Sequence, residues 1–209
     1  KLVNMRLNDF ANETASESPA PGGGSIAAYV GALGISLGTM VANLSSHKKG
    51  WDERWKEFSD HAEKGQQYKD ELLKLVDADT AAFNKIMEAF ALPKGNDAEK
   101  AARTRAIQDA TKYAIEVPFK VMETSYASME VIKSMALTGN PNSVSDAGVG
   151  ALCARTAVMG AFMNVRINAA GYSDKTYVSD IIDRGTQLQN KTMALEAEIL
   201  KLVDETIGL

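Results

Sequence analysis

The fold is decided by the sequence SPAPGGGS at residues 18–25 and by IAAYVGALGISLGTMVANLSSH, which follows it at residues 26–47. Two prolines and three glycines cannot continue a helix, so the first segment ends a short predicted helix over residues 2–15. Small residues then recur at helical spacing and predict a long helix from about Ser25 to His47. Because small side chains let a neighbouring backbone approach closely, we expect this helix to be the axis of the core.

The same stretch raises the question of a membrane span. No charged residue and no histidine occurs from Ser18 to Ser46, and its apolar part is long enough to cross a bilayer. Glycines and hydroxyl side chains dilute its hydrophobicity, however, and the other predicted helices are charged and amphipathic. A helix surrounded by other helices is apolar on all sides for the same reason. We therefore expect no membrane span, but an all-α, multihelical bundle or array with this glycine-rich helix at its centre.

Helical periodicity continues along the rest of the chain, and alternating strand patterns are nearly absent. Asn96 or Asp97 is expected to cap one helix, Pro118 either kinks that helix or starts the next, and Ser145 is expected to cap a second glycine-rich helix. The predicted helices span residues 51–92 (one helix or two stacked helices), 97–117, 118–137, 145–170 and 174–206. We predict six to eight helices in a single domain over residues 1–209.

Composition limits the classes of function. A formal net charge of −4 argues against a general nucleic-acid-binding protein. The only cysteine is Cys153, so no intrachain disulfide can form, which fits a reducing, cytoplasmic location. Two distant histidines and one cysteine do not form a convincing zinc set, and we expect neither a metal nor an organic cofactor.

One residue interrupts an otherwise apolar stripe. Residues at positions 72, 76, 79, 83, 86 and 90 are spaced like the core-facing side of a helix, and all except Asp79 are apolar. A buried carboxylate is costly unless it is paired, hydrogen-bonded or protonated, and burial moves its pKa toward neutrality. Asp79 is therefore either a general acid or base, or a structural aspartate bonded to a neighbouring helix or to Thr80. Asp77 is expected near the opposite face, in solvent.

Two helix starts could also carry function. Asp146 follows Ser145 at the start of the second glycine-rich helix. There it either stabilises the helix N-terminus or supplies a second carboxylate at the mouth of the cavity that would contain Asp79. Gly22, Gly23, Gly24 and Ser25 precede the central helix, where exposed amides suit an anion. This run lacks the features of a Walker loop or a dinucleotide fingerprint, so a tight turn without a ligand is the alternative.

Cations and amides complete the set of candidates. Lys48 and Lys49 close the central helix, where they either complement the helix dipole or hold the carboxylates of an acidic ligand. Asn164 and Asn168 lie one helical turn apart and share a face, either as amides satisfied in the core or as hydrogen-bonding partners of a ligand.

Read together, these segments resemble one known family, that of formimidoyltetrahydrofolate cyclodeaminases and methenyltetrahydrofolate cyclohydrolases. The similarity runs in order from about residue 5 to residue 205. It rests on several separate blocks: PAPGGGS at 19–25, GALG at 31–34 with LGTMV at 37–41, VDAD at 76–79 with AF at 82–83, LPK at 92–94, SD at 145–146 and NVRIN at 164–168.

The resemblance implies a multihelical homodimer with a folate bound in a cleft. It implies that Asp79 is catalytic, that Asp146 is a second acidic position, and that Lys48 and Lys49 are a basic pair near the cleft. Gly22 to Ser25, Asn164 and Asn168 are the expected substrate-binding residues, and no metal or cofactor is implied. Some organisms fuse this domain to a formiminotransferase, so a transferase partner of this chain would be a separate protein.

The resemblance leaves two reactions open. In one, 5-formimidoyltetrahydrofolate cyclises to 5,10-methenyltetrahydrofolate and releases ammonia; in the other, the methenyl compound is hydrolysed to 10-formyltetrahydrofolate. Both pass through a tetrahedral carbon between N5 and N10, and the same aspartates could serve either. We favour the cyclodeaminase. A folate-binding or scaffold protein without turnover is the alternative of a different class.

Overall fold

The computed structural model describes residues 1–208, and within that range it contains helices and no strand. The helices are η1 (Leu2–Asn4), α1 (Leu7–Thr14), α2 (Gly23–Ser46), η2 (Asp52–Arg54), α3 (Trp55–Ala91), α4 (Asp97–Thr138), η3 (Pro141–Ser143), α5 (Val144–Ala169) and α6 (Lys175–Ile207). The η elements are single turns of 3-10 helix. The predicted all-α class is confirmed, and the helix expected over residues 2–15 is split into η1 and α1.

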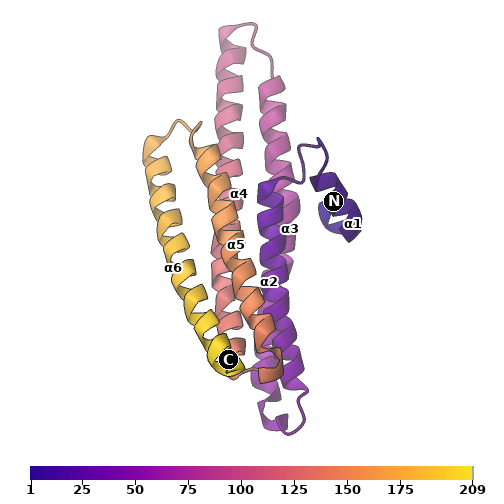
Figure 1. Ribbon diagram of the computed structural model, residues 1–209. Helices are drawn as coiled ribbons and strands as arrows, with labels where there is room; N and C mark the ends of the chain where they lie inside the picture. The colour runs from indigo at the N-terminus through magenta and orange to yellow at the C-terminus, as the bar shows by residue number, and fades with distance from the viewer. Residues whose placement is uncertain (209) are drawn as a thin grey trace.

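Helices α2 to α6 run up and down the molecule in alternating directions (Figure 1). Helix α2 descends from the glycine run, α3 rises, α4 descends, α5 rises and α6 descends again. Helices α3 and α4 have 37 and 42 residues, whereas α2 has 24 and α5 has 26. The α3–α4 pair therefore extends above the point where α2 begins and α5 ends, and this difference in length creates a step at the upper end.

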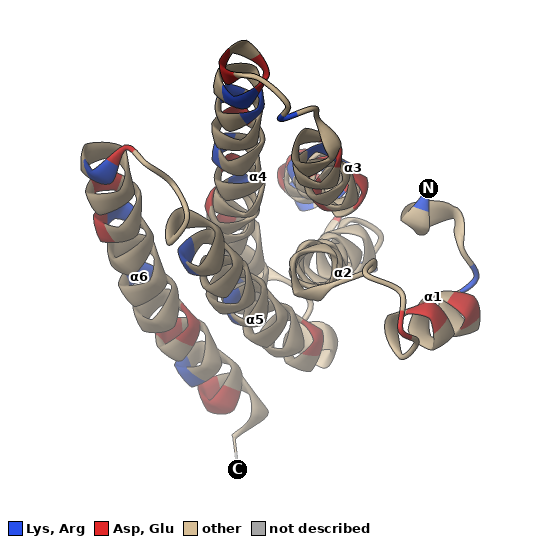
Figure 2. Ribbon diagram, turned by 90° about the horizontal axis from the view of Figure 1, so that it is seen from above, with Lys and Arg blue, Asp and Glu red and all other residues tan. Residues whose placement is uncertain are grey.

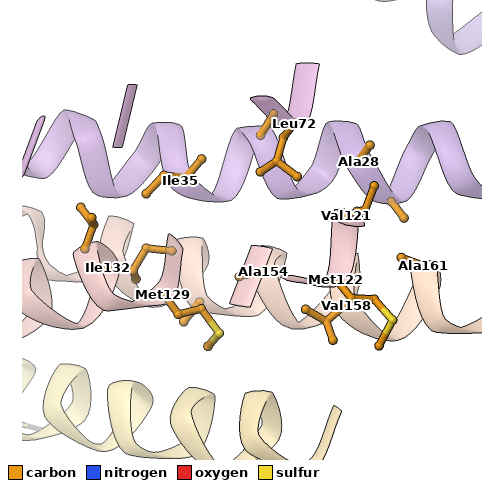
Figure 3. Packing of buried hydrophobic residues seen from close by; sticks show 14 of the residues in the cluster. Ala28, Ile35, Leu72, Val121, Met122, Met129, Ile132, Ala154, Val158 and Ala161 are labelled. Carbon is orange, nitrogen blue, oxygen red and sulfur yellow. The ribbon is translucent and has the colours of Figure 1, made fainter. Parts of the chain in front are cut away.

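The glycine-rich helix α2 lies at the centre of the core, as the sequence predicted. It packs against α3, α4 and α5. Ala28 and Ile35 of α2, Leu72 of α3, Ile132 of α4 and Val158 of α5 are fully buried in one cluster (Figure 3). Since α2 is enclosed on several sides, its apolar character follows from burial inside the bundle.

Helices α2 and α5 approach each other most closely at Gly34 and Gly150. A Cβ atom added to Gly34 would lie 2.8 Å from the carbonyl oxygen of Gly150, and one added to Gly150 would lie 2.8 Å from that of Gly34. These distances are shorter than real Cβ contacts, so only glycine allows the two backbones to meet at this spacing. The two glycine-rich helices predicted to form the core thus cross at a glycine pair.

Local signals at helix ends were partly correct. Asn96 caps α4, because its side-chain oxygen accepts a hydrogen bond of 2.9 Å from the backbone N–H of Glu99. Ser145 was wrongly predicted as a cap: η3 leads directly into α5, whose N-cap is Ser143, and Ser145 lies inside the first turn. Pro118 does not begin a new helix, because α4 continues through it from Asp97 to Thr138.

The apolar stripe of α3 is a core face only along its lower half. Leu72 and Val76 are fully buried, whereas Phe83 and Phe90 are 39% and 50% exposed. Above Asp79, α3 extends beyond the level at which α2 begins, and its main neighbour there is α4. Asp79 therefore lies where the closed bundle gives way to the two-helix extension.

Two helices retain an exposed apolar face. The segments Gly23–Ser46 and Pro141–Ala169 are long and apolar enough to cross a membrane, but at least half of each is buried within the bundle. Helix α2 contains no Lys, Arg, Asp or Glu, and Figure 2 shows it in the neutral colour along its length. The exposed large hydrophobic residues on the two helices are Leu33, Met40, Leu44, Val149, Leu152, Met163 and Ile167.

Candidate active site

A cavity of about 180 Å³ lies at the step formed by the upper ends of α2 and α5 against α3 and α4. It brings together six of the residues predicted from the sequence. These are Gly22, Gly23 and Gly24 at the start of α2, Asp79 on α3, and Asn164 and Asn168 on α5. The remaining walls come from Pro19, Ala20, Thr80, Ala82, Phe83, Ile86 and Ala114. Asp79 is the only titratable side chain among these lining residues.

The carboxylate of Asp79 lies directly against the N-terminus of α2. Its Oδ2 accepts a hydrogen bond of 2.8 Å from the Ser25 hydroxyl, and the backbone of Ser25 provides a second hydrogen bond. A Cβ atom at Gly24 would overlap the carboxylate, so glycine is required at that position. The glycine run was predicted to suit an anion, and the anion it receives in this structure is the Asp79 side chain.

The environment of Asp79 is suited to proton transfer. Burial raises the pKa of this carboxyl above its ordinary value, while the side-chain and backbone hydrogen bonds from Ser25 oppose that rise. A carboxyl with a raised pKa exchanges its proton closer to neutral pH than an exposed carboxyl does, which favours a role as acid or base. The Ser25 bonds also mean that Asp79 has a structural role, and the partner is Ser25 of the neighbouring helix rather than Thr80.

Both asparagines on α5 use their amide groups within the protein. Asn164 donates from Nδ2 to the carbonyl oxygen of Gly160 at 3.0 Å, one turn back along α5. Asn168 donates from Nδ2 to the carbonyl oxygen of Ala114 on α4 at 2.8 Å. The internal hydrogen bonds confirm the interpretation as satisfied amides, and because each side chain also lines the cavity, the ligand-binding role stays a prediction.

Sequence reasoning missed Thr80 and misplaced Asp77. Thr80 lines the cavity, and its Oγ1 atom is buried with no hydrogen-bond partner among residues 1–208. Its position beside Asp79 was the only signal available. Asp77 was expected in solvent, but its Oδ1 accepts a hydrogen bond of 2.8 Å from the backbone N–H of Leu2, which ties η1 to α3.

Three predicted site residues lie at the opposite, lower end of the helical bundle of the same protomer. Lys48 and Lys49 follow the end of α2, which at 1.5 Å per residue is about 36 Å from the glycine run. Asp146 is in the first turn of α5, about 27 Å along the helix from Asn164. The expectation that Asp146 shares the mouth of the Asp79 cavity is therefore wrong within one protomer, because the two helices run in opposite directions and carry these residues to the lower end.

The larger grooves carry weaker chemical signals. One of about 460 Å³ runs along the lower part of α2 beside Met40, Leu44 and His47, and another of about 500 Å³ lies between α3 and α4 beside Lys85 and Tyr113. Among residues 1–208, no group of three or more His, Cys, Asp or Glu side chains could hold a metal ion. The small cavity remains the best candidate because it combines a carboxyl of raised pKa with a helix N-terminus.

Comparison with known sequences identifies close relatives over the full length. A profile of the formiminotransferase-cyclodeaminase family matches residues 6–187. A methenyltetrahydrofolate cyclohydrolase of Methylorubrum extorquens is 34% identical over 205 residues, which cover 98% of this chain and 99% of that protein. A formimidoyltransferase-cyclodeaminase of Gallus gallus is 34% identical over 204 residues, but these cover only 38% of the longer avian protein.

Comparison with solved structures gives the same result. The crystal structure of a formiminotetrahydrofolate cyclodeaminase from Thermotoga maritima matches with a TM-score of 0.86 and 26% sequence identity. The match covers 99% of this chain and all of the bacterial one. From its sequence profile, its relatives and its fold, this chain belongs to the formiminotransferase-cyclodeaminase family.

Proposed function

We propose that this enzyme is a formimidoyltetrahydrofolate cyclodeaminase, which converts 5-formimidoyltetrahydrofolate to 5,10-methenyltetrahydrofolate and ammonia. The observation that carries the proposal is Asp79, a half-buried carboxyl of raised pKa in a cavity with no other titratable lining residue. The amidine substrate and the methenyl product are both cations, so a carboxylate in a small, partly enclosed cavity stabilises the charge at the reacting carbon.

The proton balance of this reaction suits a single carboxyl group. As N10 attacks the formimidoyl carbon, the new C–N10 bond forms and N10 gives up its proton to the Asp79 carboxylate. The resulting carboxylic acid then returns that proton to the departing nitrogen, the C–N bond to that nitrogen breaks, and ammonia leaves. Asp79 ends the cycle ionised, as it began, and no metal or organic cofactor is part of the proposal.

A second candidate is methenyltetrahydrofolate cyclohydrolase. It is favoured by the relative from Methylorubrum extorquens, which carries that name and matches this chain over almost the entire length of both proteins. Here Asp79 would accept a proton from the water that attacks the methenyl carbon and deliver it to N5 as the C–N5 bond breaks. The remaining hydroxyl proton leaves to solvent as the formyl C=O bond forms, which balances the loss of the cationic charge. The geometry of the site serves either reaction.

One absorbance assay separates these functions. Incubated with 5-formimidoyltetrahydrofolate, a cyclodeaminase raises the absorbance of the methenyl compound and releases one ammonia for each methenyl group formed. Incubated with the methenyl compound, a cyclohydrolase lowers that absorbance faster than buffer alone. Activity that survives dialysis against a chelator supports the absence of a metal. Folate binding without turnover in either direction would favour the non-catalytic alternative, and neither binding nor turnover would overturn the proposal.

The proposal includes a homodimer formed across the exposed face of α2 and α5. The large exposed hydrophobic side chains of α2 and α5 lie on this face, and a two-fold axis that lies in the face and runs across the helices would pair it with its own copy. Such an axis would turn the partner upside down. The lower end of one protomer would then lie beside the upper end of the other.

This arrangement accounts for the residues that one protomer separates. The partner's Lys48, Lys49 and Asp146 would approach the Asp79 cavity, although within the same chain they lie about 27 to 36 Å away along the helices. Lys48 is held over the ring of Trp51, with Nζ 4.0 Å from its centre. We propose that the two lysines bind the carboxylates of the substrate's glutamate tail. The proposal also includes a cytoplasmic location.

A further inference from the structure

A proline inside α4 has a consequence at the other side of the cavity. In an α-helix, the N–H of each residue donates to the carbonyl oxygen four residues earlier, and proline has no N–H to donate. Pro118 is buried within the 42 residues of α4, so the carbonyl of Ala114 lacks its usual helical donor. The proline ring also crowds that carbonyl and tilts it away from the helix axis.

A residue of the candidate site donates a hydrogen bond to this carbonyl in place of the missing backbone N–H. Asn168 of α5 donates from Nδ2 to the Ala114 oxygen at 2.8 Å, across 54 residues of sequence. Ala114 and Asn168 both line the Asp79 cavity. A buried carbonyl without a partner is unfavourable, which favours keeping this bond in place.

The bond also determines which way the carboxamide of Asn168 faces. A carbonyl can only accept, so the NH₂ end must point at Ala114 and the Oδ1 end must point elsewhere. Within residues 1–208, no hydrogen bond reaches Oδ1. This oxygen is therefore an unused acceptor on a residue that lines the cavity.

We propose that Pro118 is a positioning residue, which by freeing the Ala114 carbonyl orients Asn168 so that its Oδ1 accepts a hydrogen bond from an N–H group of the bound folate. The inference rests on the proposed function and adds to it a residue that does not itself contact the substrate. It also explains why a long helix contains a proline, the residue least favoured inside helices, at this point of α4.

The test is a cycle of P118A, N168A and the double variant. P118A restores the helical N–H and removes the ring that tilts the Ala114 carbonyl, so we expect this carbonyl to turn back along the helix and its bond to Asn168 to weaken. We expect P118A to melt no lower than the wild type, because alanine favours the helix. We expect kcat/KM to fall about 10-fold in P118A and in N168A, the scale of one lost hydrogen bond. The double variant should be no worse than N168A alone.

A spectroscopic measurement reads the same link without turnover. In protein labelled at asparagine nitrogen, the side-chain NH₂ resonances of Asn168, assigned by their loss in N168A, should shift in P118A and exchange faster with solvent. N168D removes the donor while keeping the size of the side chain, and it should reproduce the loss of kcat/KM even if P118A folds poorly.

Three results would overturn the inference: unchanged Asn168 resonances in folded P118A, losses in P118A and N168A that multiply in the double variant, or wild-type kcat/KM in N168D. A wild-type enzyme inactive on both folates would instead overturn the proposed function. The resonances would then still report whether Pro118 orients Asn168.

Discussion

Asp79 is both a partner of the α2 N-terminus and the proposed proton carrier, and one substitution separates these roles. In D79N the amide oxygen can still accept the Ser25 hydroxyl hydrogen, so the fold should be kept. The variant loses the basicity and the charge, and kcat should fall about 100-fold or more. Turnover of both folates should be measured alongside circular dichroism and folate binding.

The matched control for D79N is D77N, the same exchange two residues earlier on α3. Asp77 binds the Leu2 N–H through Oδ1, which asparagine can also do. D77N should therefore keep near wild-type kcat. A folded D79N enzyme with turnover equal to that of D77N would remove Asp79 from the mechanism.

The hydroxyl of Ser25 gives a prediction for the pH dependence. Its hydrogen bond lowers the pKa of Asp79 against the larger effect of burial, so S25A should raise that pKa further. The proposed first step needs the ionised carboxylate, and the acid limb of the kcat profile should therefore move to higher pH. In S36A, which removes a hydroxyl bonded to Ala32 within α2, the limb should not move. A limb that moves to lower pH in S25A would contradict this assignment.

At the scale of residues, the sequence predicted which side chains matter better than how they are connected. Asp79 could be found because a carboxylate interrupts an apolar stripe. Its bond to Ser25 could not be found, because it joins positions 54 residues apart. The link between Pro118 and Asn168 is of the same kind, since neither residue carries a local signal for the other.

At the scale of elements, the crossing of α2 and α5 depends on its glycine pair. G34A places a Cβ atom 2.8 Å from the Gly150 oxygen and 2.9 Å from the Cys153 Cβ, so the helices must separate. The free energy of unfolding should fall by about 1–3 kcal/mol, as in other overpacked cores. Thermal or denaturant unfolding measures this loss.

Gly160 of α5 provides the control for G34A, which changes a glycine of α2. A Cβ atom at Gly160 would meet only the Cβ of Ala27, at 3.4 Å, which is an ordinary contact. G160A should therefore be neutral or should stabilise the protein by up to about 1 kcal/mol through helix propensity. Equal destabilisation by the two variants would mean that the close crossing is not what requires glycine at position 34.

Helix lengths were the part of the fold that sequence patterns described least well. Periodicity located the helices because burial of one face repeats every three to four residues. Periodicity could not show that α3 extends beyond α2, since Phe83 and Phe90 have the same spacing whether a neighbouring helix covers them or not. Pro118 was ambiguous for a related reason: Asn168, which accommodates it, lies in another helix.

At the scale of the whole molecule, the antiparallel course of the helices separates residues that sequence blocks suggested were neighbours. Asp146 was expected beside Asp79 because both belong to the same family pattern, but such a pattern does not say which chain supplies each residue. The exposed apolar side chains of α2 and α5 offer a physical answer, because pairing of this face with a second copy about an axis across the helices would bring opposite ends together. A stable monomer in light scattering at micromolar concentration would contradict that pairing.

The sharpest test of the paired site uses two inactive variants. D79N and D146N should each lose activity, since every site of either homodimer lacks one carboxylate. In a mixed dimer, the D146N protomer keeps its own Asp79 and receives the intact Asp146 of the D79N protomer, which restores one of its two sites. Random pairing of equal amounts makes half of the dimers mixed, so activity should recover to about a quarter of the wild type.

The variants should be co-expressed with different tags, and the mixed dimer purified through both tags should reach about half of wild-type turnover. If both carboxylates act within one chain, the mixed dimer stays inactive, because each protomer still lacks one of them. A fully active D146N homodimer would show instead that Asp146 has no part in the reaction.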